Sequence, residues 1–159
     1  MKEEVFKDLI DRYKLYLEEF GLEKEQYKWE AIRHFQQTFD IDPEDFTKNF
    51  KDAVSKAHNL VYQNSIGFIR KSAEYFPEDV REMFRVLYND EVSLENRFEQ
   101  FTEAAEKLLP KVVEEYGKKL NHQQDERTIS YYLTMRFPDK YPLYKNETYK
   151  YLLSIMGGL

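Results

Sequence analysis

The sequence contains no cysteine. Disulfides, thiolate metal sites and cysteine nucleophiles are therefore excluded, and the composition suits a reducing compartment such as the cytosol. The three histidines, His34, His58 and His122, are far apart in the sequence and belong to no metal-binding motif. We therefore expect neither a bound metal nor a cofactor.

Glycine and proline are scarce, with five of each in 159 residues. An all-β chain of this length needs more turn residues than this. The scattered glycines form no G-x-x-x-x-G-K-[ST] or G-x-G-x-x-G phosphate loop, and no G-x-S-x-G nucleophile elbow is present. The acidic residues are dispersed, and no pair of them is singled out for acid–base chemistry. We predict that the chain has no catalytic centre and is not an enzyme.

Long apolar runs and an excess of basic charge are also absent. No stretch of eighteen apolar residues exists, and the first residues, MKEEVFKDLIDRY, lack the continuous apolar centre of a signal peptide. We expect a cytoplasmic protein with no membrane association. The net charge of −6 argues against tight, non-specific nucleic-acid binding, although it leaves room for a local basic patch.

Apolar residues recur at three- and four-residue steps along most of the chain, which is the spacing of a buried helix face. No stretch alternates apolar and polar residues for more than three or four positions. The predicted fold is all-α: a single compact domain of seven or eight helices over residues 1–159, and not a simple four-helix bundle. The helices are expected near residues 5–20, 25–39, 42–57, 77–87, 93–112, 125–136 and 146–156, with a weaker signal over 60–76.

Local signals predict where these helices begin and end. Starts are indicated by capping or N-terminal residues at Asp42-Pro43, Pro77, Ser93, Asp125 and Asn146. The acids at 40, 42, 44 and 45 fit helix capping better than a calcium loop, which needs a different spacing and a glycine. Gly21 is predicted to end the first helix, residues 64–67 to form a break or bend, and Pro110 to kink or divide its helix.

The stretch TISYYLTMRFPDKYPLYKNETYKYLL, residues 128–153, differs from the rest of the chain. From Arg127 to Tyr151 there are five basic and two acidic residues, a net charge of +3, so the remainder carries −9. Basic residues interleaved with aromatics suit phosphate contact and base stacking, but they equally suit a packed loop whose tyrosine hydroxyls face water. The candidate nucleic-acid-binding residues here are Arg136, Lys140 and Lys145 for phosphates, and Tyr141 and Tyr144 for stacking.

Arg136 ends an apolar stripe formed by Ile129, Tyr132 and Leu133. One interpretation is structural, because an arginine near a helix C-terminus can satisfy the last carbonyls. The other is an anion or base contact, with the guanidinium fork held in place by packing. Trp29 also has two interpretations. Its helical spacing favours a place in the core. The alternative is an aromatic surface on which a base stacks, with Arg33 one turn beyond it.

Two segments resemble a known family. YKWEAIRHFQQTFDIDPEDFTKNFKDAVSKAHNL and DERTISYYLTMRFPDKYPLYKNETYKYL look like the N-terminal region of McrB-type proteins, the AAA+ NTPase subunits of modification-dependent restriction systems in phage defence. In that family this region precedes a nucleotide-hydrolysing motor that works with a separate nuclease subunit, and some members recognise modified DNA there. The resemblance implies that this chain is an N-terminal piece of a longer protein, without the motor. No established binding residue can be carried over.

Two functions follow as hypotheses. The leading one is a non-catalytic recognition module of a McrB-like restriction NTPase that contacts modified or unmodified DNA. The alternative is a protein-interaction or assembly module that docks the motor or a partner subunit. Its proposed surface is an apolar seam at residues 94, 98, 101, 105, 108 and 112, which must be exposed to serve this purpose.

Overall fold

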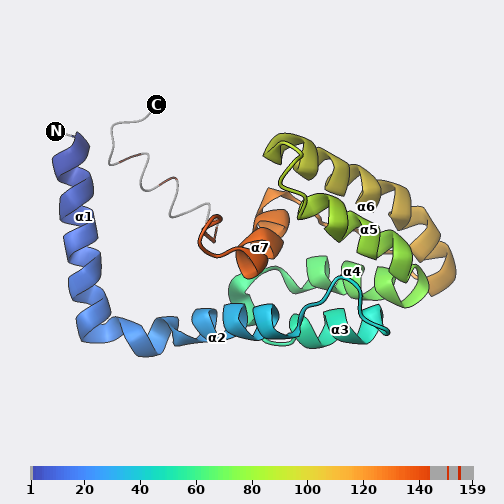
Figure 1. Cartoon of the computed structure of the whole chain (residues 1–159), viewed down its shortest axis with the longest axis horizontal. Helices are drawn as coiled ribbons and strands as arrows, with labels where there is room; N and C mark the ends of the chain where they lie inside the picture. The colour runs from blue at the N-terminus through green and yellow to red at the C-terminus, as the bar shows by residue number, and fades with distance from the viewer. Residues whose placement is uncertain (1, 144–149, 151–153, 155–159) are drawn as a thin grey trace. The chain divides into compact units, whose positions relative to one another are not determined.

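The computed structural model describes residues 2–143, 150 and 154. Over these residues the fold is all-α, with no strand, which confirms the predicted fold class (Figure 1). The predicted helix after Asn146 lies outside the described residues. The elements are α1 (Lys2–Tyr16), a π-helical turn (Leu17–Gly21), α2 (Leu22–Thr38), α3 (Phe46–Ala53), a 3-10 turn (His58–Leu60), α4 (Gln63–Tyr75), α5 (Pro77–Leu87), α6 (Leu94–Tyr116) and α7 (Glu126–Arg136).

The chain divides into two compact units, residues 1–30 with 144–159 and residues 31–143. In the second unit α5 and α6 run side by side, α4 packs on α3, α5 and α6, and α7 packs on α6 (Figure 1). The first unit contains α1, the π-helical turn and the first part of α2. That residues 1–159 form a single domain stays a prediction.

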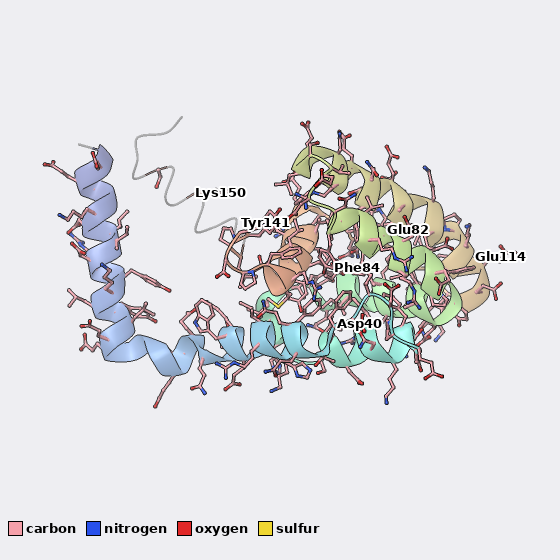
Figure 2. The ribbon with its side chains drawn as sticks, in the orientation of Figure 1. Asp40, Glu82, Phe84, Glu114, Tyr141 and Lys150 are labelled. Carbon is pink, nitrogen blue, oxygen red and sulfur yellow. The ribbon has the colours of Figure 1, made fainter. Side chains whose placement is uncertain are left out.

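The core of the second unit is centred on Phe84 of α5, whose side chain is fully buried (Figure 2). Five aromatic rings surround it, with centroids 5.1–5.7 Å from its own. They belong to Phe39, Phe50, Tyr88, Phe101 and Tyr132. Because these residues come from five different segments, this one cluster ties together α3, α5, α6, α7 and the end of α2.

The start of α3 corrects one prediction. The N-cap is Asp45, whose carboxylate accepts the Lys48 N–H at 2.9 Å, and not Asp42. The helix begins later because Asp42 is used elsewhere: its carboxylate pairs with Arg81 and Arg85 of α5, 39 and 43 positions away. Local spacing predicted that Asp42 would cap this helix, but in the structure Asp42 forms ion pairs with a distant helix instead.

The three predicted breaks have different outcomes. α1 ends at Tyr16 and the π-helical turn after it ends at Gly21, close to the predicted end of the first helix, but α2 begins directly at Leu22 with no loop between them. Gly67 lies inside α4, and the real interruption precedes that helix, between Ala53 and Gln63. Pro110 lies inside the 23-residue α6, so it does not divide this helix in two. It is tolerated there because Pro110 and Glu106 are both exposed, so water can bind the carbonyl that loses its donor.

The predicted starts at Pro77, Ser93 and Asp125 are confirmed. The Asp125 carboxylate accepts the Thr128 N–H at 2.9 Å and the Thr128 hydroxyl at 3.1 Å. Burial acts to raise the pKa of Asp125, but the hydrogen bonds from Thr128 and Arg127 outweigh it and hold this pKa below its usual value. The charged cap thus fixes the beginning of α7, the helix that ends at Arg136.

Removing this cap gives a testable prediction. Asp125→Ala should lower the free energy of unfolding by about 1 kcal/mol at neutral pH. A carboxylate whose pKa is lowered by folding stabilises above its unfolded pKa of about 4, and the effect is lost as the pH falls through the folded value. The gap between wild type and variant should therefore narrow as the pH falls below about 4. Urea unfolding at pH 7 and pH 3 measures this, with the exposed neighbour Glu126→Ala as control; an undiminished gap at pH 3 would contradict the role of the charged form.

Candidate nucleic-acid interface

Arg136 is the last residue of α7 and is half-buried. Its guanidinium lies over the Phe137 ring, 5.9 Å from the centroid, and its backbone carbonyl accepts a hydrogen bond from the Gln36 side chain at 3.4 Å. Burial raises the pKa of Tyr88, and the positive charge of Arg136 acts in the opposite direction. Arg136 is therefore held against aromatic residues at the point where α2 meets α7.

The guanidinium of Arg136 makes no hydrogen bond or ion pair with another described residue. In particular it donates to no carbonyl in the last turn of α7; the Leu133 carbonyl there accepts the Phe137 N–H at 2.8 Å. A hydrogen bond to a terminal carbonyl is one form of the structural interpretation; the other, attraction of the cation to the negative end of the helix dipole, needs no hydrogen bond and stays a prediction. Packing against Phe137 restricts the side chain, while none of its donors is used by another residue in the described part of the chain.

Arg33 lies on the exposed face of α2, one turn before Gln36. Its guanidinium likewise has no acidic partner among the described residues. Of the seven arginines in residues 31–143, four pair with an aspartate or glutamate, and these four are Arg81, Arg85, Arg97 and Arg127. Because the Gln36–Arg136 hydrogen bond joins α2 to α7, two arginines without carboxylate partners lie on neighbouring elements.

Lys140 and Tyr141 have partners within the fold. The Lys140 ammonium lies 2.7 Å from the Asp90 carboxylate, and the Tyr141 hydroxyl accepts from Arg97 at 3.0 Å. The hydrogen bond from Lys140 lowers the pKa of Asp90, and the same bond raises the pKa of Lys140. Both residues anchor the loop after α7, and their roles in binding stay predictions.

The remaining candidates lie elsewhere. Lys145 and Tyr144 are outside the described residues. Trp29 lies on the part of α2 that belongs to the first unit, and its side chain is 63% exposed. Interpreting it as core is wrong: among the residues of α2 whose burial is described, the first buried one is Ala31, where the helix enters the second unit.

Sequence reasoning missed Arg97, the most buried charged residue described, at 4% exposure. It donates to the Leu87 carbonyl at 3.1 Å and to the Tyr141 hydroxyl, and lies 3.6 Å from the Asp90 carboxylate. Arg97 precedes Phe101 by four residues, so the two side chains lie on the same face of α6. This spacing could have predicted from the sequence that Arg97 is buried. Arg97 therefore joins the α5–α6 connection to the loop that follows Arg136.

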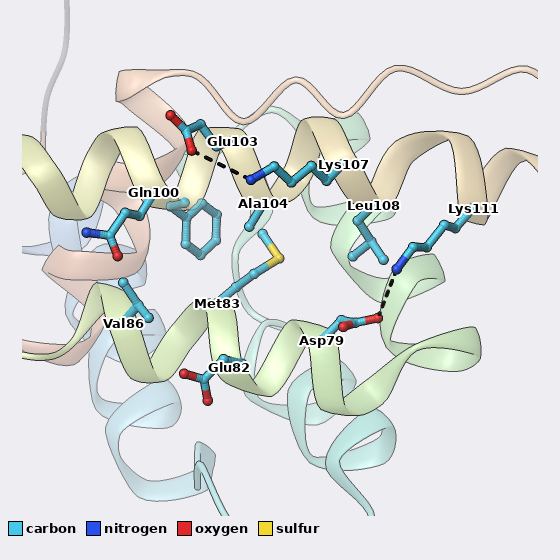
Figure 3. A pocket seen from close by; sticks show the side chains of 11 residues that line it. Asp79, Glu82, Met83, Val86, Gln100, Glu103, Ala104, Lys107, Leu108 and Lys111 are labelled. Atoms are coloured by element: carbon cyan, nitrogen blue, oxygen red, sulfur yellow. Dashed lines mark ion pairs between the residues drawn. The ribbon is translucent and has the colours of Figure 1, made fainter.

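A recess of about 390 Å3 lies between α5 and α6 (Figure 3). Met83, Val86, Ala104 and Leu108 contribute its apolar lining. Ion pairs border it, from Asp79 to Lys111 at 4.0 Å and from Glu103 to Lys107 at 3.8 Å (Figure 3). This volume is in the range of small-ligand or side-chain pockets.

The apolar seam of α6 is not the docking surface that the sequence suggested. Phe101, Ala105, Leu108 and Val112 are buried in the core, and only Leu94 at its start is strongly exposed. The seam is therefore not a free helix face, although Phe101 and Leu108 also line the recess between α5 and α6.

No group of metal-ligating side chains able to hold an ion occurs among the described residues, and none of the described helices is long and apolar enough to cross a bilayer. Comparisons with protein families, curated proteins and solved structures gave no match. The resemblance to McrB-type proteins therefore remains an expectation from the two quoted segments.

Proposed function

We propose that the chain is a non-catalytic recognition module that contacts DNA, within a McrB-like restriction NTPase of the cytoplasm. The observation that carries the proposal is Arg136, held over Phe137 with its guanidinium donors unused by any described residue. A pre-oriented arginine fork binds a phosphate bidentately, or the O6 and N7 atoms of guanine, at little cost in side-chain entropy.

Arg33 and Lys140 extend this surface. Arg33 adds a second unpaired guanidinium from α2, and Lys140 adds an exposed ammonium four residues after Arg136. Lys140 can bind a phosphate only if its ammonium group first leaves the Asp90 carboxylate. This competition, together with the net charge of −6, favours selective rather than tight general binding.

Arg136→Ala is expected to weaken DNA binding at least tenfold, equivalent to about 1.4 kcal/mol, because a fork contact is lost. Fluorescence anisotropy with plain, methylated, hydroxymethylated and glucosylated duplexes measures the affinity across a salt series. Arg85→Ala is the matched control, since it removes an equally charged side chain whose partner is Asp42.

If Arg136→Ala and Arg85→Ala weaken DNA binding equally, the loss reflects the change in overall charge. That result would contradict a specific site at Arg136. Absence of binding to every duplex and single strand at low salt would overturn the proposal as a whole.

The recess between α5 and α6 supports the second candidate, an assembly module that docks the motor or nuclease subunit. An apolar recess bordered by ion pairs suits the insertion of an apolar side chain from a helical partner. Retention of the motor or nuclease in a pull-down, by a chain that binds no oligonucleotide, would favour this candidate over DNA recognition.

A further inference from the structure

Three lysines from different parts of the second unit gather around one glutamate and one tyrosine. Lys51 of α3 and Lys71 of α4 both bind the Glu74 carboxylate, at 2.6 and 2.5 Å. Lys71 and Lys118, which follows α6, both lie over the Tyr116 ring, 4.8 and 5.6 Å from its centroid. We call these three lysines with Glu74 and Tyr116 the lysine cluster.

The charges of the lysine cluster do not balance. Glu74 is its only acid, and among the described residues no other carboxylate forms an ion pair with the three lysines. The hydrogen bonds from Lys51 and Lys71 lower the pKa of Glu74, so its carboxylate is charged and already shared by two ammonium groups. The cluster therefore carries a net charge of +2 in a unit with sixteen basic and twenty acidic side chains.

The aromatic ring gives the cluster defined geometry. Cation–aromatic contacts hold the Lys71 and Lys118 ammonium groups on one ring. Lys118 follows Gly117, which ends α6 in the left-handed conformation at φ 69°, so the backbone sets where this lysine emerges. The three ammonium groups, from α3, α4 and the residues after α6, are therefore held close together. Lysines without these contacts would not be held in this way.

We propose that the lysine cluster is a second DNA contact, binding backbone phosphates. Ammonium groups act as point charges that bind phosphates whatever the base sequence, whereas an arginine fork binds base edges as well as phosphates. The inference rests on the proposed function, since the lysine cluster and Arg136 would contact the same nucleic acid. The lysine cluster would supply position and affinity, and Arg136 would supply selectivity.

The test is the salt dependence of binding to a plain duplex. Each phosphate contact contributes about 0.9 to the slope of log affinity against log salt. Lys118→Ala should reduce the slope by about this amount, and Glu74→Gln should strengthen binding because it releases Lys51 and Lys71. Lys107→Ala is the matched control: it removes the same charge from the side of α6 that pairs with Glu103, and should leave the slope unchanged.

The outcomes separate the two proposals. Equal slopes for wild type and Lys118→Ala, with binding that still depends on Arg136, would overturn only the lysine cluster. Equal effects from Lys107→Ala and Lys118→Ala would also overturn it, because bulk charge then explains both. A wild-type chain that binds no nucleic acid would overturn the lysine cluster and the proposed function together.

Discussion

Replacement of Phe84 by alanine is expected to lower the free energy of unfolding by about 4 kcal/mol. Phe84 is fully buried and contacts five other aromatic rings, so its removal loses apolar burial and leaves a cavity among rigid rings. The loss is a large fraction of the stability of a domain of this size. Urea unfolding followed by circular dichroism measures it.

The matched control is Tyr62→Ala, because Tyr62 is an aromatic residue of the same unit with 58% of its surface exposed. Its replacement should change the free energy of unfolding by no more than about 0.5 kcal/mol. Similar losses for the two variants would show that Phe84 is not the centre of the core.

Arg97→Ala is expected to cost about 3 kcal/mol, because it breaks a buried, hydrogen-bonded charge interaction. The Leu87 carbonyl and the Tyr141 hydroxyl lose their donor, and Lys140 is then the one ion-pair partner of Asp90 among the described residues. Arg97→Lys should recover only part of the loss, since an ammonium cannot reproduce the fork that reaches both acceptors. Urea unfolding measures all three proteins.

Arg85→Ala serves as the control for Arg97, since its ion pair with Asp42 is exposed and should contribute less than about 1 kcal/mol. Equal costs at positions 85 and 97 would contradict the structural role assigned to Arg97. Full recovery by Arg97→Lys would show that charge alone is needed there.

The features predicted correctly from the sequence are those fixed by neighbouring residues. Ser93 and Asp125 cap their helices through residues three positions ahead, and Pro77 opens α5 with its own constrained backbone. Periodicity likewise predicted helices over 77–87 and 93–112, close to the observed α5 and α6. These features depend on residues within one or two helical turns of each other, and sequence patterns are informative over that distance.

The errors arose where a distant residue decides the outcome. Asp42 is taken from its expected cap by Arg85, and Trp29 is exposed because the packing of α2 begins two residues later. The same holds for the candidate site. Arg136 could be singled out by its place on the stripe, but the pairing of Lys140 with Asp90, fifty positions away, could not.

In the proposed function, Arg136 reaches an anion instead of stabilising the end of α7. The most direct test measures both properties of Arg136→Ala: its free energy of unfolding, and its affinity for the duplex that wild type binds best. We predict a stability change within about 0.5 kcal/mol and an affinity loss of at least about tenfold. A stability loss of about 1 kcal/mol or more with unchanged affinity would contradict the account and make Arg136 a helix-terminal residue.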